Sequence, residues 1–248
     1  MERRALIIYC DDIGKEVDIL TGPPYDNANY RAYLQSMLGG EWRSYEIESL
    51  RNPNLMSILR MINSFMAEAD YTFIIFTGHG SIDPKKNNMQ YLDILGGTSI
   101  PITTLFTKAK RQTLIIDACR GYYTPEKPTI KKFSALLEDS VETTFSTRLL
   151  FNRKVRLAEE GITILYAASE NQSARDTPKG AAYLLSLLDA AEIWKKDNKE
   201  DTLSLKQAHN LASRFIGTKY KTIQIPTMEL EKREKYFPFA VKVIPIVG

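Results

Sequence analysis

Four short, nearly continuous apolar runs constrain the fold of this chain more than any other feature. They lie at residues 5–10, 71–76, 113–116 and 162–167. Strands that are apolar on both faces are typical of a parallel sheet covered on both sides, whereas strands with one solvated face alternate in polarity. We therefore expect these four runs to be interior strands of a mainly parallel sheet.

Helical spacing of apolar residues separates these runs. Residues 30–38 show such spacing, and the glycines that follow, Gly39 and Gly40, are expected to end a helix there. Asn54 is expected to cap a second helix. Its predicted inner face comprises Leu55, Ile58, Leu59, Ile62, Phe65 and Met66.

The second half of the chain continues the alternation of strands and helices. Helices are predicted around residues 181–191 and 205–215. Strand–helix alternation predicts an α/β fold with helices on both faces of the sheet. The proline-containing tail is expected to add antiparallel edge strands near the C-terminus, carrying Ile223, Ile225, Phe237 and Phe239.

Size and composition restrict the class of protein. The chain has 248 residues, 44% of them hydrophobic, which predicts one domain over residues 1–248. The net charge of +3 and the lack of a Lys/Arg block argue against nucleic acid as a partner. No apolar run is long enough for a signal peptide or a membrane span. Two cysteines, Cys10 and Cys119, form no disulfide framework, so we expect a cytoplasmic location.

Two of the predicted strands end in short polar motifs, one containing His79 and the other containing Cys119. The carboxyl ends of parallel strands lie along one edge of a sheet, so the two residues are expected to be neighbours. A Cys nucleophile needs a base to form thiolate near neutral pH, and a nearby His is the usual one. The N–H of Gly80 could help to hold an oxyanion. Alone, each residue is more often an ordinary core residue; together they favour catalysis.

These motifs resemble those of caspase-like cysteine peptidases. The caspase signature Gln-Ala-Cys-Arg-Gly is matched by residues 117–121, and Ser-Gly-His-Gly is matched by residues 77–80. Asp117 stands where caspases have Gln, as in metacaspases, orthocaspases and paracaspases. Weaker likeness extends over residues 24–28, 166–176 and 224–228. The resemblance implies a caspase-like sandwich with a His–Cys dyad.

The resemblance also implies an internal organisation of the domain. Residues 1–121 would form a large-subunit-like part, 122–156 a connecting segment, and 157–248 a small-subunit-like part. The connection contains several basic residues, and exposed loops are where proteolysis concentrates. We expect Lys131 or Lys132, rather than Arg153, to be the site if the enzyme cuts itself, because a helix over about 146–159 would protect the later sites.

In the metacaspase and paracaspase branch, the resemblance implies that Asp26 and Asp117 line the primary specificity pocket. Carboxylates can bind an Arg guanidinium in bidentate fashion or a Lys ammonium as a point charge. The expected substrate is therefore a protein or peptide with a basic residue before the scissile bond. Ser169, Asp176 and Glu170 are further substrate-binding candidates. The alternatives are a helix N-cap role for Asp26 and a strand-end turn role for Asp117.

The remaining candidates carry less chemistry. No metal-loop spacing is present, so neither a metal site nor another cofactor is expected, although some metacaspases are activated by calcium. Cys10 is expected to be a core residue whose thiol pKa is raised by Asp11 and Asp12. His209 is expected to be a solvated residue on a helix surface.

Three function classes follow from these observations. The first is a cysteine endopeptidase that cleaves after Arg or Lys; by analogy with small members of the family, it would act in defence or cell death and have a regulatory protein partner. The second is a catalytically silent caspase-like interaction module. The third, a nucleotide-binding α/β protein, requires a Gly-rich phosphate loop, and residues 11–14 match one poorly.

Overall fold

A central six-stranded sheet forms the core of the computed structural model, which describes residues 1–14, 17–122, 146–197, 199–230 and 234–244. The strand order is β10-β8-β7-β3-β1-β2. All neighbouring pairs are parallel except β10 and β8. The predicted parallel sheet with an antiparallel edge is thus confirmed. The strands are β1 (Arg3–Tyr9), β2 (Ile47–Arg51), β3 (Tyr71–Thr77), β7 (Arg111–Asp117), β8 (Gly161–Tyr166) and β10 (Thr227–Leu230).

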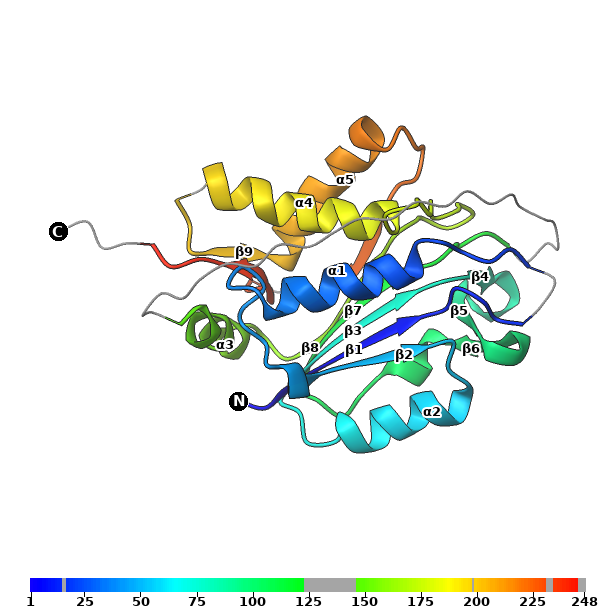
Figure 1. The fold of residues 1–248 in the computed structure, drawn as a ribbon, viewed down its shortest axis with the longest axis horizontal. Helices are drawn as coiled ribbons and strands as arrows, with labels where there is room; N and C mark the ends of the chain where they lie inside the picture. Colours follow the sequence, from blue (N-terminus) through cyan, green and yellow to red (C-terminus); the bar gives the residue numbers. More distant parts are fainter. Residues whose placement is uncertain (15–16, 123–145, 198, 231–233, 245–248) are drawn as a thin grey trace.

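Helices cover both faces of this sheet, as expected (Figure 1). On one face lie α1 (Pro23–Gln35), α4 (Ala182–Asp197) and α5 (Leu205–Lys219). On the other face lies α2 (Leu55–Arg60), while α3 (Thr147–Leu157) lies near the N-terminus. Short 3₁₀ turns occur at Ser44–Glu46, Pro84–Lys86, Leu95–Gly97 and Ile102–Leu105.

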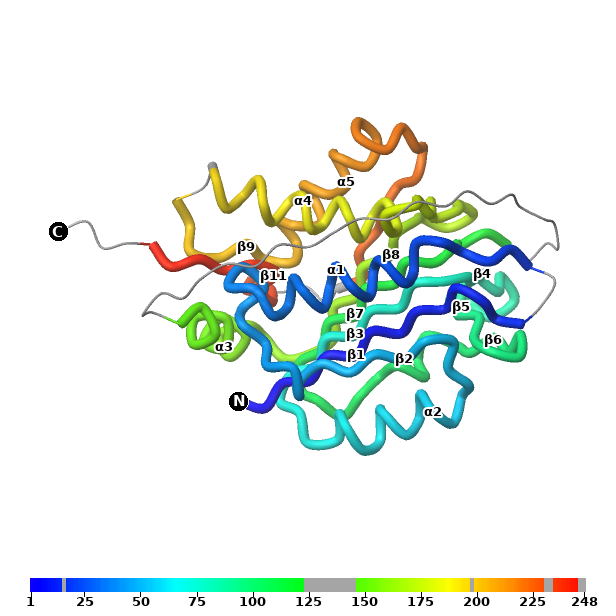
Figure 2. The backbone as a smooth tube through the Cα atoms, viewed as in Figure 1, coloured from blue at the N-terminus to red at the C-terminus, as the bar shows by residue number. Residues whose placement is uncertain are grey.

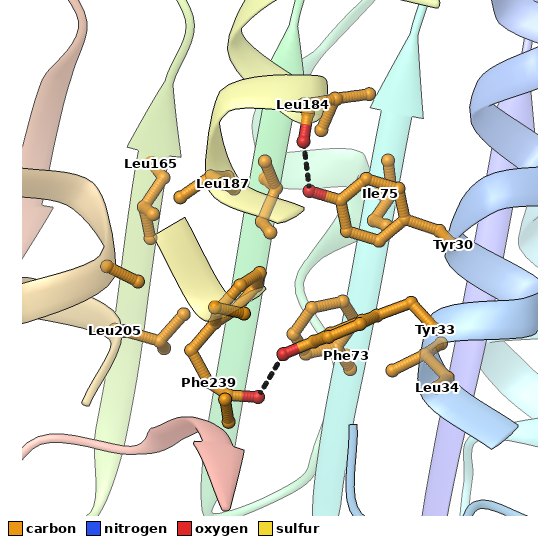
Figure 3. Packing of buried hydrophobic residues seen from close by; sticks show 14 of the residues in the cluster. Tyr30, Tyr33, Leu34, Phe73, Ile75, Leu165, Leu184, Leu187, Leu205 and Phe239 are labelled. Atoms are coloured by element: carbon orange, nitrogen blue, oxygen red, sulfur yellow. Dashed lines mark hydrogen bonds between the residues drawn. The ribbon is translucent and has the colours of Figure 1, made fainter. Parts of the chain in front are cut away.

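Successive residues of the central strands divide between two cores. In β1, Ala5 and Ile7 belong to the core beneath α1 and α4, whereas Leu6 and Ile8 belong to the opposite core. Figure 3 shows the first core, where the hydroxyl of Tyr30 donates to the carbonyl of Leu184. Burying each Leu or Ile side chain contributes about 1.5–3 kcal/mol, so these strands are apolar on both faces.

Four of the shorter strands, and β2 of the central sheet, were not predicted from the sequence, whereas β11 contains Phe239, one of the residues expected in the antiparallel strands of the tail. A three-stranded antiparallel sheet, β4-β5-β6, lies beyond the end of the central strands where β3 and β7 finish (Figure 2). The inward positions of β5 include the buried Gln90, and a polar inward residue obscures the alternating pattern. The small strands are β4 (Gly80–Asp83), β5 (Met89–Ile94), β6 (Thr98–Pro101), β9 (Thr202–Ser204) and β11 (Pro238–Val241), of which β9 and β11 form a two-stranded antiparallel sheet.

The first helix ends earlier than predicted, at Gln35 rather than at Gly39. Ser36 adopts an extended conformation, and its N–H donates to the carbonyls of Ala32 and Tyr33 at the end of α1. Gly39 still serves the turn that follows, because a Cβ there would lie 2.0 Å from the carbonyl oxygen of Tyr33.

The second helix begins as predicted but has a different inner face. The Asn54 side chain accepts a 2.9 Å hydrogen bond from the N–H of Ser57, which confirms the cap. After Arg60 the helix continues as a π-helical turn over Met61–Phe65. Ile58, Ile62 and Met66 are buried, but Leu55 is exposed, because the first turn of α2 extends beyond the core.

Two predictions about the C-terminal third are wrong. Ile223 and Ile225 lie outside any strand and are 91% and 58% exposed, because the buried residue between them, Gln224, turns them outward. His209 is buried rather than solvated, and its Nδ1 lies 2.7 Å from the hydroxyl of Tyr183. Burial lowers the pKa of His209 to about 4.

The predicted helix near the end of the connecting segment is present as α3, with Arg153 on its exposed face. Lys131 and Lys132 lie outside the described residues. In the part of the chain that the structure describes, no helix is both long and apolar enough to cross a membrane.

Candidate active site

The pairing of two central strands places the two polar motifs at one edge of the sheet. Thr77 of β3 is aligned with Asp117 of β7, and the N–H of Gly78 donates a 3.1 Å hydrogen bond to the carbonyl of Asp117. His79 and Cys119 each follow two residues after this aligned pair. The two side chains therefore leave adjacent strands at the same end, as the sequence motifs predict.

The ring of His79 is held by a backbone carbonyl. Its Nε2 lies 2.8 Å from the carbonyl oxygen of Asp18, in the loop between β1 and α1. A carbonyl oxygen can only accept, so Nε2 carries the proton in the neutral ring and Nδ1 keeps a free lone pair. This tautomer suits His79 to take a proton at Nδ1.

Cys119 is half-buried, and its Sγ lies 3.9 Å from the carbonyl oxygen of Ala174. Burial raises the pKa of the thiol, and the charges of Asp117 and Asp93 raise it further, although contacts with Ala174 and Ser173 offset part of the rise. The resting group is therefore a thiol that requires a base before it can act as a nucleophile.

Cys10 occupies a structural position beneath the loop that carries His79. A Cβ on Gly78 would lie 2.9 Å from the Cβ of Cys10, so the two backbones pack closely. Burial raises the pKa of Cys10 to about 12, and the charge of Asp11 adds to the rise. The predicted core role of Cys10 is confirmed.

Gly80 lies where no larger residue fits. A Cβ there would be 2.7 Å from the carbonyl oxygen of Tyr91 and 2.9 Å from the side chains of Ala118 and Gln90. The buried amide of Gln90, a residue that the sequence analysis did not single out, donates to the carbonyls of Tyr91 (2.9 Å) and Cys119 (3.2 Å). Gln90, which lies in β5, thus ties that strand to the residue that bears the thiol.

Asp26 is a buried acid in the first turn of α1. The N-cap of this helix is Gly22, so the alternative of an N-cap role for Asp26 does not hold. Its Oδ2 accepts a 2.7 Å hydrogen bond from the hydroxyl of Thr77, and its Oδ1 accepts a 2.9 Å bond from the N–H of Ala181. These bonds fix Asp26 beside the end of β3, next to the motif that carries His79.

Asp117 and Asp176 complete a group of three acids with Asp26. Burial raises the pKa of Asp26 to about 8, raises that of Asp117 well above its ordinary value, and raises that of Asp176. The charges of Asp26 and Asp176 raise the pKa of Asp117 further, so the three groups are close enough to interact. The structure thus brings together acids from α1, from the end of β7 and from the loop after β8.

Two oxygens of this acid group have no hydrogen-bond partner among the described residues. They are Oδ2 of Asp117 and Oδ1 of Asp176, and both are buried. The other Asp176 oxygen, Oδ2, accepts from the N–H groups of Thr21 and Gly22 at 3.0 Å. A buried acceptor without a partner is costly, so this group is suited to a ligand that donates hydrogen bonds and carries positive charge.

Ser169 and Glu170 have surroundings different from those of the three acids. The Ser169 hydroxyl donates to Oε1 of Gln172 at 2.7 Å, within the loop that follows β8. Glu170 accepts a 2.8 Å bond from Asn88 and lies 3.9 Å from the guanidinium of Arg120. Both side chains therefore brace the loop after β8.

One residue of the site, Asp18, has no recognisable signal in the sequence. Asp18 contributes only its backbone carbonyl, which any residue would provide. Arg120 is buried over the ring of Tyr166, 4.2 Å from its centroid, and donates to the hydroxyl of Thr227 at 3.3 Å.

Among the described residues, no group of three or more His, Cys, Asp or Glu side chains is arranged to hold a metal ion.

Replacing Asp26 with Asn is expected to stabilise the fold more at pH 9 than at pH 5. The pKa of Asp26 in the folded protein, about 8, lies above its ordinary value near 3.9, so ionisation of Asp26 lowers the free energy of unfolding. This loss is absent below pH 4 and is complete once the pH has risen through 8. Asn carries no charge, and the Thr77 hydroxyl can either donate or accept. Urea unfolding should show a gain of a few kcal/mol at pH 9, since each pKa unit corresponds to about 1.4 kcal/mol.

The matched control for this prediction is Asp12→Asn, at an exposed position. Its effect on the free energy of unfolding should be small at both pH values. An Asp26→Asn variant with the same difference from wild type at pH 5 and pH 9 would show that Asp26 keeps an ordinary pKa in the folded protein.

Comparison with known proteins agrees with this geometry. The family model described as "Caspase domain" matches residues 2–238. The crystal structure of caspase-1 from Spodoptera frugiperda is similar in fold, with a TM-score of 0.60 at 11% sequence identity, over 92% of this chain and 88% of that one. No curated protein matches the sequence significantly.

Proposed function

Because the chain belongs to the caspase-domain family, whose model matches residues 2–238, we propose that it is a cysteine endopeptidase that cleaves after Arg or Lys. In this proposal Cys119 is the nucleophile, His79 is the general base and acid, and Asp26, Asp117 and Asp176 bind the basic side chain. The substrate is a protein or peptide.

The observation that carries the basic specificity is the group of three acids, of which Asp26 and Asp117 are buried and Asp176 is half-buried. Two of its oxygens, on Asp117 and Asp176, are buried without partners among the described residues. An Arg or Lys side chain would supply both the missing donors and the missing positive charge. An acidic side chain would instead meet like charge, and a purely apolar one would leave the oxygens unpaired.

The expected mechanism uses the tautomer that the Asp18 carbonyl selects. Nδ1 of His79 takes the proton from Cys119, and the thiolate attacks the carbonyl carbon of the substrate. The N–H groups of Gly80 and Cys119 are the candidate donors to the resulting oxyanion. His79 then gives the proton to the departing amine, and water hydrolyses the thioester to release the acid and the free thiol.

The observation that favours the alternative, a catalytically silent interaction module, is the raised pKa of the Cys119 thiol. A cysteine that stays protonated in a buried site can be inert. The raised pKa is compatible with the endopeptidase proposal, because His79 needs to ionise the thiol only when a substrate is bound and water is excluded.

Fluorogenic peptides that end in Arg, Lys, Asp or Leu test the proposed function directly. Wild-type protein should cleave the Arg and Lys peptides and leave the other two nearly intact, since only the basic side chains can pair with the acids. The control is the Cys119→Ala protein prepared in the same way. Cleavage after Asp, or equal activity in the control, would overturn the proposal.

We further propose that the enzyme works in a reducing, cytoplasmic compartment and needs no cofactor. Cys10 and Cys119 are both free thiols. Hydrolysis through a thioester requires only the thiol, the imidazole and water. A regulatory partner and a role in defence or cell death remain part of the proposal by analogy with small members of the family.

A further inference from the structure

Two segments that are distant in sequence meet beside the candidate active site. One is the loop of residues 169–176, which follows β8; the other is the segment of residues 220–226, which leads from α5 to β10. Gln224 joins them with its side-chain amide. Its Oε1 accepts a 3.0 Å hydrogen bond from the N–H of Arg175, and its Nε2 donates a 2.7 Å bond to the carbonyl of Ala167 at the end of β8.

Gln172 makes a second link between the same two segments. Its Oε1 accepts a 2.9 Å hydrogen bond from the N–H of Ile225 and a 2.7 Å bond from the hydroxyl of Ser169. Each glutamine reaches from its own segment to the other, so together they join the loop of residues 169–176 to residues 220–226. Gln224 is the more buried of the two, at 4% exposed.

The same loop contacts Cys119 and its neighbour Arg120. The N–H of Arg120 donates to the carbonyl of Gln172, and the N–H of Asn171 donates to the carbonyl of Arg120, both at 2.9 Å. The loop also brings the carbonyl of Ala174 to Sγ of Cys119 and carries Asp176 into the acid group. A shift of the loop would therefore move the surroundings of the thiol and the pocket together.

We propose that Gln224 is a positioning residue that sets the place of residues 169–176 against Cys119. The inference rests on the proposed function, and it adds a residue that touches neither the thiol nor the acids. Without the Gln224 side chain, the buried carbonyl of Ala167 and the part-buried N–H of Arg175 lose their partner, and each unpaired group favours movement of the loop.

The chemistry of this position requires an amide. One atom must accept from Arg175 while the other donates to Ala167, and among side chains of this length only Gln does both near neutral pH, where a Glu carboxyl is ionised. A Glu carboxylate accepts at both oxygens, so one of them would face the Ala167 carbonyl with no hydrogen between them. A protonated Glu regains the donor and can restore both bonds.

The test is the pH dependence of Gln224→Glu, measured on Arg peptides as the ratio of its kcat/KM to that of wild type. At pH 8 the ratio is expected to be about one tenth or lower, because the ionised carboxylate repels the Ala167 carbonyl. As the pH falls toward 5.5 the ratio should rise toward one. Gln224→Ala should stay low at every pH, since Ala cannot regain the donor.

Two controls separate this role from general loss of structure. Gln207→Glu is a matched change at an exposed capping-box position on α5. It keeps the capping acceptor and loses only a 3.3 Å bond to Glu200 at the surface, so its ratio should stay near one throughout. Thermal unfolding of each variant at each pH sets an assay temperature at which all are folded. A Gln224→Glu protein that equals wild type at pH 8, or that follows Gln224→Ala at all pH values, would overturn the proposal.

A second measurement keeps this inference separate from the proposed function. If wild type cleaves none of the peptides, the proposed function fails, but iodoacetamide labelling of Cys119 still reports on the loop. A displaced loop uncovers Sγ, so Gln224→Glu should be labelled several-fold faster than wild type at pH 8 and at a rate closer to wild type at pH 5.5. Equal labelling rates at pH 8 would show that Gln224 does not hold the loop.

Discussion

Replacing either Cys119 or His79 with Ala is expected to lower kcat on Arg and Lys peptides by several orders of magnitude. Combining the two changes should lower kcat little further than either change alone, because neither residue is catalytic without the other. The placement of both residues at the ends of adjacent strands, and the Asp18 carbonyl that fixes the His79 tautomer, are the structural reasons. Steady-state kinetics of the two single variants and the double variant provide the measurement.

The matched control for the dyad is Cys10→Ala. Cys10 is buried beneath the same edge of the sheet, and its thiol pKa of about 12 keeps it protonated, so its loss should leave kcat nearly unchanged. Iodoacetamide should likewise label Cys119 faster than Cys10. If the losses from Cys119→Ala and His79→Ala multiply in the double variant, the two residues act independently and are not a dyad.

Replacing Asp117 with Asn is expected to lower kcat/KM on Arg and Lys peptides at pH 8 by about two to three and a half orders of magnitude. Removing one partner of a buried charge pair costs roughly 3–5 kcal/mol, and each 1.4 kcal/mol is a factor of ten. Asp117 should matter most, because it is buried, interacts with both other acids and has an oxygen without a partner among the described residues. Asn keeps the shape of the side chain and removes only its charge.

The control for this change is Asp201→Asn. Asp201 also pairs with a cation, Lys154, but at the surface beside β9, so kcat/KM should stay close to wild type. The preference for Arg over Leu peptides is the second readout, and it should fall by a factor similar to the loss on Arg peptides. Full activity of Asp117→Asn on basic peptides would place the specificity pocket elsewhere.

The sequence alone was sufficient to predict the central sheet, because burial on both faces of a strand is visible as a run of apolar residues. The runs that became β1, β3, β7 and β8 are apolar at successive positions, which is typical of a parallel sheet covered on both faces. The strands of the small β4-β5-β6 sheet have no such apolar run. They are four to six residues long, and one inward position is the amide of Gln90.

Surface and interior were harder to distinguish for polar residues on helices. His209 was predicted to be solvated because its neighbours in sequence are polar, yet it is buried against the hydroxyl of Tyr183. Asp26 was open to interpretation as a helix cap, and it is instead an acid fixed by Thr77 and Ala181. In both cases the deciding partner lies far away in the chain, where sequence spacing gives no information.

The sequence by itself determined the parallel sheet, the family resemblance and the placement of His79 and Cys119 at one edge, because apolar strand runs and short motifs are local properties. Only the tertiary structure decided which groups surround that pair. The carbonyl of Asp18, the convergence of Asp176 with the other acids and the amide of Gln224 all come from loops. A loop's position depends on hydrogen bonds to distant segments, and backbone carbonyls look the same in every residue, so the sequence carries no local sign of them.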